Sequence, residues 1–125
     1  MTALQDPNGA CDLLILSNPV SHSAVSIING NAIDLRQYFG VATVIFQVAT
    51  LSAGALVCSL QDSPDGTSDW VTFAPVGFDT VSAGVSNQRR AFLVASTRGF
   101  IRASFDNQAG SFRYNACILA PRCLV

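Results

Sequence analysis

Residues 55–74 of the chain, ALVCSLQDSPDGTSDWVTFA, form two short apolar segments on either side of a polar turn. In the first segment Leu56, Cys58 and Leu60 occupy every second position, which is the period of a β-strand with one apolar face. The connecting residues 62–67 bring Pro, Asp and Gly together in an order that favours a tight turn. The stretch therefore predicts a β-hairpin, with a second strand from Trp70 to Ala74.

The same pattern of short strand candidates and turn residues recurs along the rest of the chain. The further candidates are residues 13–16, 24–28, 32–36, 41–50, 91–96, 100–105 and 112–119. Asn29-Gly30-Asn31 predicts a second hairpin. Asn18-Pro19 is expected to stop the first strand, and the polar residues 86–90 are interpreted as a loop.

This spacing predicts an all-β, single-domain fold. We expect a β-sandwich or jelly-roll-like barrel of about eight short antiparallel strands with extended termini. Residues 1–12 are interpreted as an N-terminal arm, 13–119 as the β-sandwich domain and 120–125 as a C-terminal tail.

Composition supports this fold class. The chain has 125 residues, of which 50% are hydrophobic and only 12% charged, whereas a soluble domain has about 25% charged residues. All seven basic residues are Arg and all eight acidic residues are Asp, so both Lys and Glu are absent. Because Lys and Glu are strong helix formers that populate solvent-facing helices, their absence favours strands.

The apolar content also indicates assembly. Residues 41–50 carry apolar side chains on both sides of the expected strand, which predicts that both faces are covered. A lone sandwich of this size needs fewer hydrophobic residues, and large exposed apolar patches mark partner surfaces. The alternative is that Ala and Cys raise the percentage without forming a patch. We favour an obligate oligomer.

Charge and targeting signals exclude several classes of protein. A net charge of -1, with Arg89-Arg90 as the basic pair, disfavours nucleic-acid binding. Residues 41–60 have the length of a membrane helix, but Gln47 and Gly54 interrupt them. Two strands joined by a turn near residues 52–54 fit better. Because the N-terminus lacks the features of a signal peptide, we expect folding in the host cytoplasm.

Few residues are suited to catalysis or metal binding. His22 lies between two serines, but no GxSxG motif accompanies it. Asp62, Asp65 and Asp69 could hold calcium, yet they lack EF-hand spacing, and Asx turns explain them more simply. The four cysteines (Cys11, Cys58, Cys117 and Cys123) form no CxxC pair, so free thiols are favoured over two disulfides. We expect no enzyme activity, cofactor or metal.

Residues 56–70, LVCSLQDSPDGTSDW, resemble the "apolar strand, LQ-S-DG, then W" element found in many small tailed-bacteriophage virion proteins. Residues 99–105, GFIRASF, resemble the "aromatic, apolar, Arg, apolar" strand that follows this element in those proteins. The resemblance covers approximately residues 41–119. It implies a capsid decoration (cement) protein, or another head or tail component.

A cement protein binds the outside of the phage head, commonly as a trimer, and clamps neighbouring major capsid subunits. The resemblance thus implies a virion location, with the major capsid protein and sister copies as partners. Both termini are candidate arms, and four arginines are candidates for forked hydrogen bonds to the shell. The expected contact residues are Thr2, Leu4, Arg89, Arg90, Arg98, Arg102, Arg122, Leu124 and Val125. Deleting residues 2–11 is expected to reduce capsid occupancy but not folding.

Two other functions remain open at this point. A tail-tube or tail-completion protein would share the β architecture but form hexameric rings. A carbohydrate-binding β-domain would use an aromatic side chain such as Trp70 to stack against a sugar.

Overall fold

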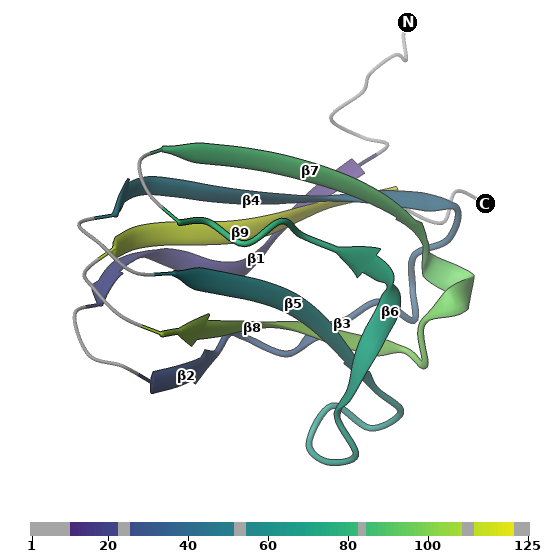
Figure 1. Ribbon diagram of the computed structural model, residues 1–125. Coiled ribbons are helices and arrows are strands. Elements are labelled where there is room, and N and C mark those ends of the chain that lie inside the picture. Colours follow the sequence, from purple (N-terminus) through teal and green to yellow (C-terminus); the bar gives the residue numbers. More distant parts are fainter. Residues whose placement is uncertain (1–10, 23–25, 52–54, 83–84, 109–111, 122–125) are drawn as a thin grey trace, which may run out of the picture.

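The computed structural model describes residues 11–22, 26–51, 55–82, 85–108 and 112–121. They form nine strands and one short 3-10 helix, η1 (Figure 1). The elements are β1 (Cys11–His22), β2 (Ser26–Asn29), β3 (Ile33–Asp34), β4 (Val41–Leu51), β5 (Leu56–Ser63), β6 (Val71–Gly77), β7 (Ser86–Leu93), η1 (Val94–Ser96), β8 (Phe100–Asn107) and β9 (Phe112–Pro121).

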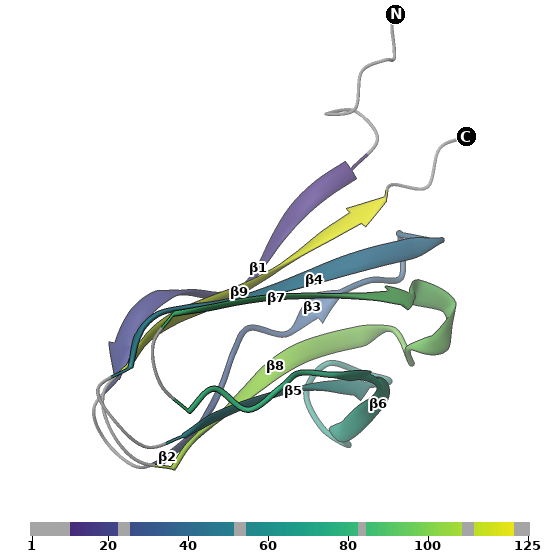
Figure 2. The same cartoon turned by 45° about the horizontal axis from the view of Figure 1, so that its top comes forward.

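Two antiparallel sheets pack face to face as two layers (Figure 2). The order in the first sheet is β1-β9-β4-β7, and in the second it is β2-β8-β5-β6, with β3 also paired to β8. The predicted all-β sandwich is confirmed, but the layers do not close into a barrel. With β3 set aside, this order is the double Greek key of a jelly roll, in which the first and last strands are neighbours.

The hairpin predicted from residues 55–74 is confirmed. β5 and β6 pair antiparallel, with Gln61 opposite Thr72 and Asp62 opposite Val71. The second strand is longer than expected because it continues through Pro75 to Gly77. β6 is an edge strand, where the missing N–H of a proline interrupts no ladder.

The first strand is also longer than expected. β1 spans twelve residues, so the stop predicted at Asn18-Pro19 is wrong. Its pairing with β9 shifts register between Ile15 and Ser17 and again between Ser17 and Val20. Such bulges let an edge strand accommodate a proline and bend without ending.

The hairpin predicted at Asn29-Gly30-Asn31 is wrong. β2 and β3 both pair with β8, one after the other along the same side, instead of pairing with each other. A two-residue hairpin of the Asn-Gly type needs positive φ at its centre, and Gly30 does not adopt it. A side chain at Gly30 would instead collide with the carbonyl of Leu16, so the glycine serves a close approach between the sheets.

The polar residues 86–90, interpreted as a loop, form most of strand β7. β7 pairs with β4 and lies at the edge of its sheet. Asn87 and Arg89 face outward, while Gln88 and Arg90 on the other side hydrogen-bond to the backbone of Asp79 and Gly77. An edge strand tolerates such polar residues, which is why hydrophobicity did not reveal it. The expected strand at residues 91–96 is the end of β7 followed by η1.

The core lies between the two sheets. Phe46 from β4, Phe105 from β8 and Tyr114 from β9 pack there, with ring centroids 5.9 Å apart for Phe46 and Phe105 and 4.4 Å apart for Phe105 and Tyr114. In β4 the even-numbered residues from Ala42 to Val48 are buried and the odd-numbered ones face outward. Within the single chain, therefore, the second face of this strand stays open.

The strands extend slightly beyond the domain boundaries expected from the sequence. Cys11 and Asp12 belong to β1, and Ala120 and Pro121 belong to β9. Cys11 lies opposite Pro121 in the ladder, so the chain enters and leaves the first sheet at the same end. A deletion meant to spare the fold must therefore end at residue 10.

Candidate interaction surface

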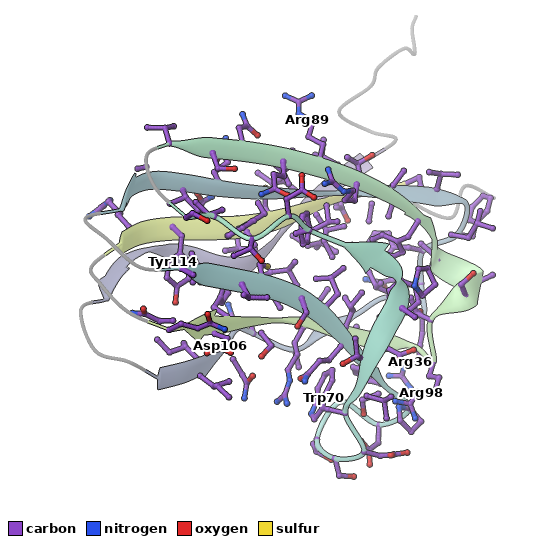
Figure 3. The ribbon with its side chains drawn as sticks, in the orientation of Figure 1. Arg36, Trp70, Arg89, Arg98, Asp106 and Tyr114 are labelled. Carbon is purple, nitrogen blue, oxygen red and sulfur yellow. The ribbon has the colours of Figure 1, made fainter. Side chains whose placement is uncertain are left out.

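Four of the arginines expected to contact a partner lie in the described residues, in different surroundings. Arg98 precedes β8, Arg102 lies in β8, and Arg89 and Arg90 are adjacent in β7. Figure 3 labels Arg89 and Arg98. The remaining expected contact residues lie outside the described residues: Thr2, Leu4, Arg122, Leu124 and Val125.

Arg98 anchors the β5–β6 loop. Its Nε donates to Asp62 Oδ1 at 3.2 Å, and its Nη1 donates to Asp69 Oδ2 at 3.0 Å. Its Nη2 donates to the backbone carbonyls of Asp62 and Asp69, at 2.6 and 2.8 Å. The hydrogen bond to Asp62 is the main reason that the pKa of Arg98 is raised. With its donors used inside the chain, Arg98 stabilises the loop.

Asp65 organises the tip of the same loop by accepting hydrogen bonds from backbone N–H groups of that loop. Its Oδ1 accepts hydrogen bonds from the N–H groups of Thr67 and Ser68, at 3.0 and 2.9 Å. These bonds, that of Ser68 first, hold the pKa of Asp65 well below its usual range. This is the Asx-turn geometry, while Asp62 and Asp69 face Arg98. The described residues contain no cluster of His, Cys, Asp or Glu suited to a metal.

Arg90 and Arg102 are each partly engaged. Arg90 Nε donates to the carbonyl of Gly77 at 2.9 Å, and its guanidinium lies 5.6 Å from the centre of the Phe78 ring. The guanidinium of Arg102 stacks 4.3 Å from the centre of the Trp70 ring, and its Nε donates to Gln61 Oε1 at 2.8 Å. Arg90 thereby connects β7 to the end of β6 in the other sheet, whereas Arg102 is held on its own sheet.

Arg89 differs from the other three. Its side chain is exposed on the outer face of β7 and points away from the sheets in Figure 3. Within the described residues, its guanidinium has neither a hydrogen-bond nor an ion-pair partner. Of these four arginines, Arg89 is the one with all its donors free for another molecule.

The outer face of the β1-β9-β4-β7 sheet is apolar at the end where β1 begins. Five large aliphatic side chains there are substantially exposed: Leu13 (59%), Ile15 (39%), Val41 (56%), Leu93 (55%) and Leu119 (41%). We call these five residues the apolar patch. Leu13 pairs with Leu119, Val41 pairs with Leu93, and Ile15 is two residues from Leu13. The two pairs meet at Thr43, which lies opposite Leu119 and two residues from Val41, so the patch is contiguous. Its members come from all four strands of the sheet.

The other end of this face is polar. Asn115, Gln47 and Asn87 lie side by side across β9, β4 and β7, forming a row of three carboxamides. They line a shallow hollow of about 290 Å³. The row next to the amide row is mixed. It starts at Ile15 of the apolar patch and continues across the sheet through Cys117, Ile45 and Arg89.

The outer face of the second sheet has a different character. Along β8, Arg102, Ser104 and Asp106 point outward, next to Gln61 and Ser59 of β5. A second hollow, of about 360 Å³, lies at the end of the sandwich between residues 35–39 and 94–99. Both arginines that line it, Arg36 and Arg98, are paired with aspartates.

The cysteines and the histidine that the sequence offered as candidate reactive groups form no common site among the described residues. Cys58 is a free thiol in the core and Cys117 a free, half-buried thiol on the outer face. Burial raises the pKa of both thiols. The side chains of Cys11, His22 and Cys123 lie outside the described residues.

The sequence pattern did not reveal the apolar patch as a surface. It is assembled from four strands that are far apart in the chain, so only pairing register brings its members together. A signal did exist in residues 41–47, where Val41, Thr43, Ile45 and Gln47 alternate with the buried residues.

Comparison with protein-family models found no matching family, and comparison with curated proteins found no similar sequence. Among the described residues, no helix has the length and apolar character needed to cross a membrane.

Proposed function

We propose that this chain is a structural protein of a phage virion, a decoration (cement) protein that binds the outside of the capsid and stabilises contacts between major capsid subunits. The observation that carries the proposal is the apolar patch. Exposed apolar area of this kind costs free energy in water, and covering it by another protein removes that cost. A role in assembly explains why these side chains stand on an outer face.

Two further observations support the same role. The double Greek-key connectivity occurs in viral capsid proteins, although it also occurs in lectins and therefore does not decide function. The elements that carry the resemblance, residues 56–70 and 99–105, form the β5–β6 hairpin and the adjacent strand β8. A lattice of capsid subunits would present many copies of one modest contact, which makes weak binding effective.

Direct labelling of particles tests this proposal. Antibodies against the purified protein, applied to intact particles from cells that express the gene, are expected to decorate the head in electron micrographs. Labelling confined to the tail would replace the cement role by that of a tail-tube or completion protein. Particles that carry no label on head or tail would reject both.

The carbohydrate alternative is tested separately through Trp70. The guanidinium of Arg102 stacks against this indole, which occupies aromatic surface that a sugar would need. We therefore expect a glycan array to show no binding that is lost in Trp70→Ala. Trp70-dependent binding would favour a sugar-binding domain over the virion role.

A further inference from the structure

We infer that the outer face of the β1-β9-β4-β7 sheet is a self-complementary interface on which a second copy of this chain packs, related by a two-fold axis parallel to the strands. The inference rests on the proposed function only in assuming that the chain works as part of an assembly. It goes further by naming a second copy as the occupant of the apolar patch. It also names the symmetry, because a two-fold axis gives a dimer, whereas the resemblance implies a trimer.

The argument starts from the register of the sheet. The outward residues form rows across the strands, and a two-fold axis that runs along the strands between β9 and β4 places each row on the same row of the second copy. This operation exchanges β1 with β7 and β9 with β4. An isologous contact of this type closes on itself.

Apolar residues then meet small or apolar residues. In one row Leu13 lies over Ala91 of the second copy, and Leu119 lies over its Thr43. In the next row Cys117 lies over Ile45 of the second copy. Two sheets packed face to face and nearly aligned form the ordinary β-sandwich contact, about 10 Å thick. Leu13 and Leu119 of the apolar patch are thereby covered in each copy.

The amide row is self-complementary as well. Asn115 lies over Gln47 of the second copy, and the reverse contact repeats it. A carboxamide both donates and accepts hydrogen bonds, so two such groups satisfy each other without any other partner. The hollow of about 290 Å³ beside this row leaves space for bridging water.

The charged residues of this face lie at its margins. Its described residues include Arg89 and Arg113 but no carboxylate. Exchange of β1 with β7 places the two copies of Arg89 at opposite edges, each with its aliphatic stem over Ile15 and its guanidinium in solvent. Arg113 lies beyond the amide row, at the end of the face.

Sedimentation velocity over a range of concentrations is the first test. The full chain is expected to form dimers, and Leu119→Asp is expected to weaken dimerisation at least about tenfold, because it buries an unpaired charge in the interface. Ile27→Asp is the matched control, since Ile27 is 68% exposed on the second sheet, and its dimerisation should not change. Circular dichroism checks that both variants fold.

Cross-linking tests the symmetry. In a background with Cys11, Cys117 and Cys123 changed to alanine, one preparation carries Leu13→Cys and another Ala91→Cys. Within one chain these positions lie three strands apart, about 14 Å, whereas the two-fold axis brings them together between copies. A short bismaleimide should therefore join the mixed preparations, and much less each preparation alone.

Several outcomes would overturn the pair. Monomers at all concentrations, a dimer insensitive to Leu119→Asp, or equal cross-linking in mixed and single preparations would each reject it. A trimer or a hexamer would also reject it but would leave the virion role standing. Unlabelled particles would remove the proposed virion role without affecting the pair.

Discussion

The outer faces of the two sheets belong to the same fold and yet differ in chemistry. On the β2-β8-β5-β6 side the arginines are bound to neighbours, as Arg102 is to Trp70 and Gln61. On the β1-β9-β4-β7 side aliphatic side chains are exposed, and the guanidinium of Arg89 has no partner within the described residues. The arginine of the β2-β8-β5-β6 face has its partners inside the chain, whereas the arginine of the β1-β9-β4-β7 face has none among the described residues.

This difference also separates stability from assembly. Residues whose contacts are internal contribute to the free energy of unfolding, and residues exposed on the patch contribute little to it, so that their proposed role is in association. The two faces can therefore be tested by the same kind of variant with opposite expectations.

The largest effect on folding is expected for Arg98→Ala. The Asp62 side chain, only 9% exposed, would lose its ion pair and become an uncompensated charge. We expect the thermal unfolding midpoint to fall by several degrees, measured by circular dichroism, with Arg89→Ala as control. Equal midpoints for the two variants would contradict the distinction between the faces.

Acid should weaken the same loop through Asp65. Its pKa in the folded chain lies below the value of about 3.9 in an unfolded chain. The carboxylate therefore stabilises the fold above about pH 4, and this contribution is lost as the pH falls further toward the folded pKa. Asp65→Asn should be less stable than the parent at pH 6, and the difference should shrink at pH 3.

Urea unfolding at the two pH values measures this change. Asp106→Asn is the control, because the Asp106 carboxylate accepts a hydrogen bond only from Gln108, at 3.5 Å, among the described residues. A gap between parent and Asp65→Asn that stays constant with pH would show that the charge of Asp65 is not responsible.

A smaller effect is expected for Arg102→Ala. The variant loses one cation–π contact and one hydrogen bond at a half-buried site, which together stabilise by about 1 kcal/mol. Urea unfolding followed by Trp70 fluorescence measures it, since Trp70 is the only tryptophan. A loss of stability equal to that of Arg98→Ala would mean that the outward-facing side chains of β8 contribute more to the free energy of unfolding than their exposure suggests.

The smallest effect on folding is expected on the patch itself. Leu93→Thr removes exposed apolar surface from an edge strand and should change the unfolding free energy of the monomer by less than about 0.5 kcal/mol. Its solubility should rise, as measured by light scattering at increasing concentration. A large loss of stability would place Leu93 in the fold instead of at an interface.

Prediction from the sequence succeeded where local chemistry decides structure. The β5–β6 hairpin follows from alternation and from the turn residues 62–67, and both are properties of neighbouring positions. Prediction failed at Gly30, whose role is a contact with Leu16 in a distant strand. It failed also at residues 86–90, whose polar side chains are compatible with a strand only because β7 lies at a sheet edge.

The candidate surface shows the same division. The excess of apolar residues and the scarcity of charge are properties of composition, and they predict a covered surface, which stays a prediction. The sequence could not show which arginines are available to a partner, because nothing local distinguishes Arg98 from Arg89. The donors of Arg98 are engaged, whereas the guanidinium of Arg89 has no partner among the described residues.

The sequence by itself determined that the chain forms strands, roughly where most of them lie, and that it is rich in apolar and poor in charged residues. Alternation and composition are properties of the sequence alone, so they need no tertiary contacts. Only the tertiary structure decided which side chains share a face. Strands that neighbour each other in space, such as β1 and β9, come from opposite ends of the chain. Their register, set by the packing of the whole core, placed Leu13 beside Leu119 and left Arg89 on the same open face.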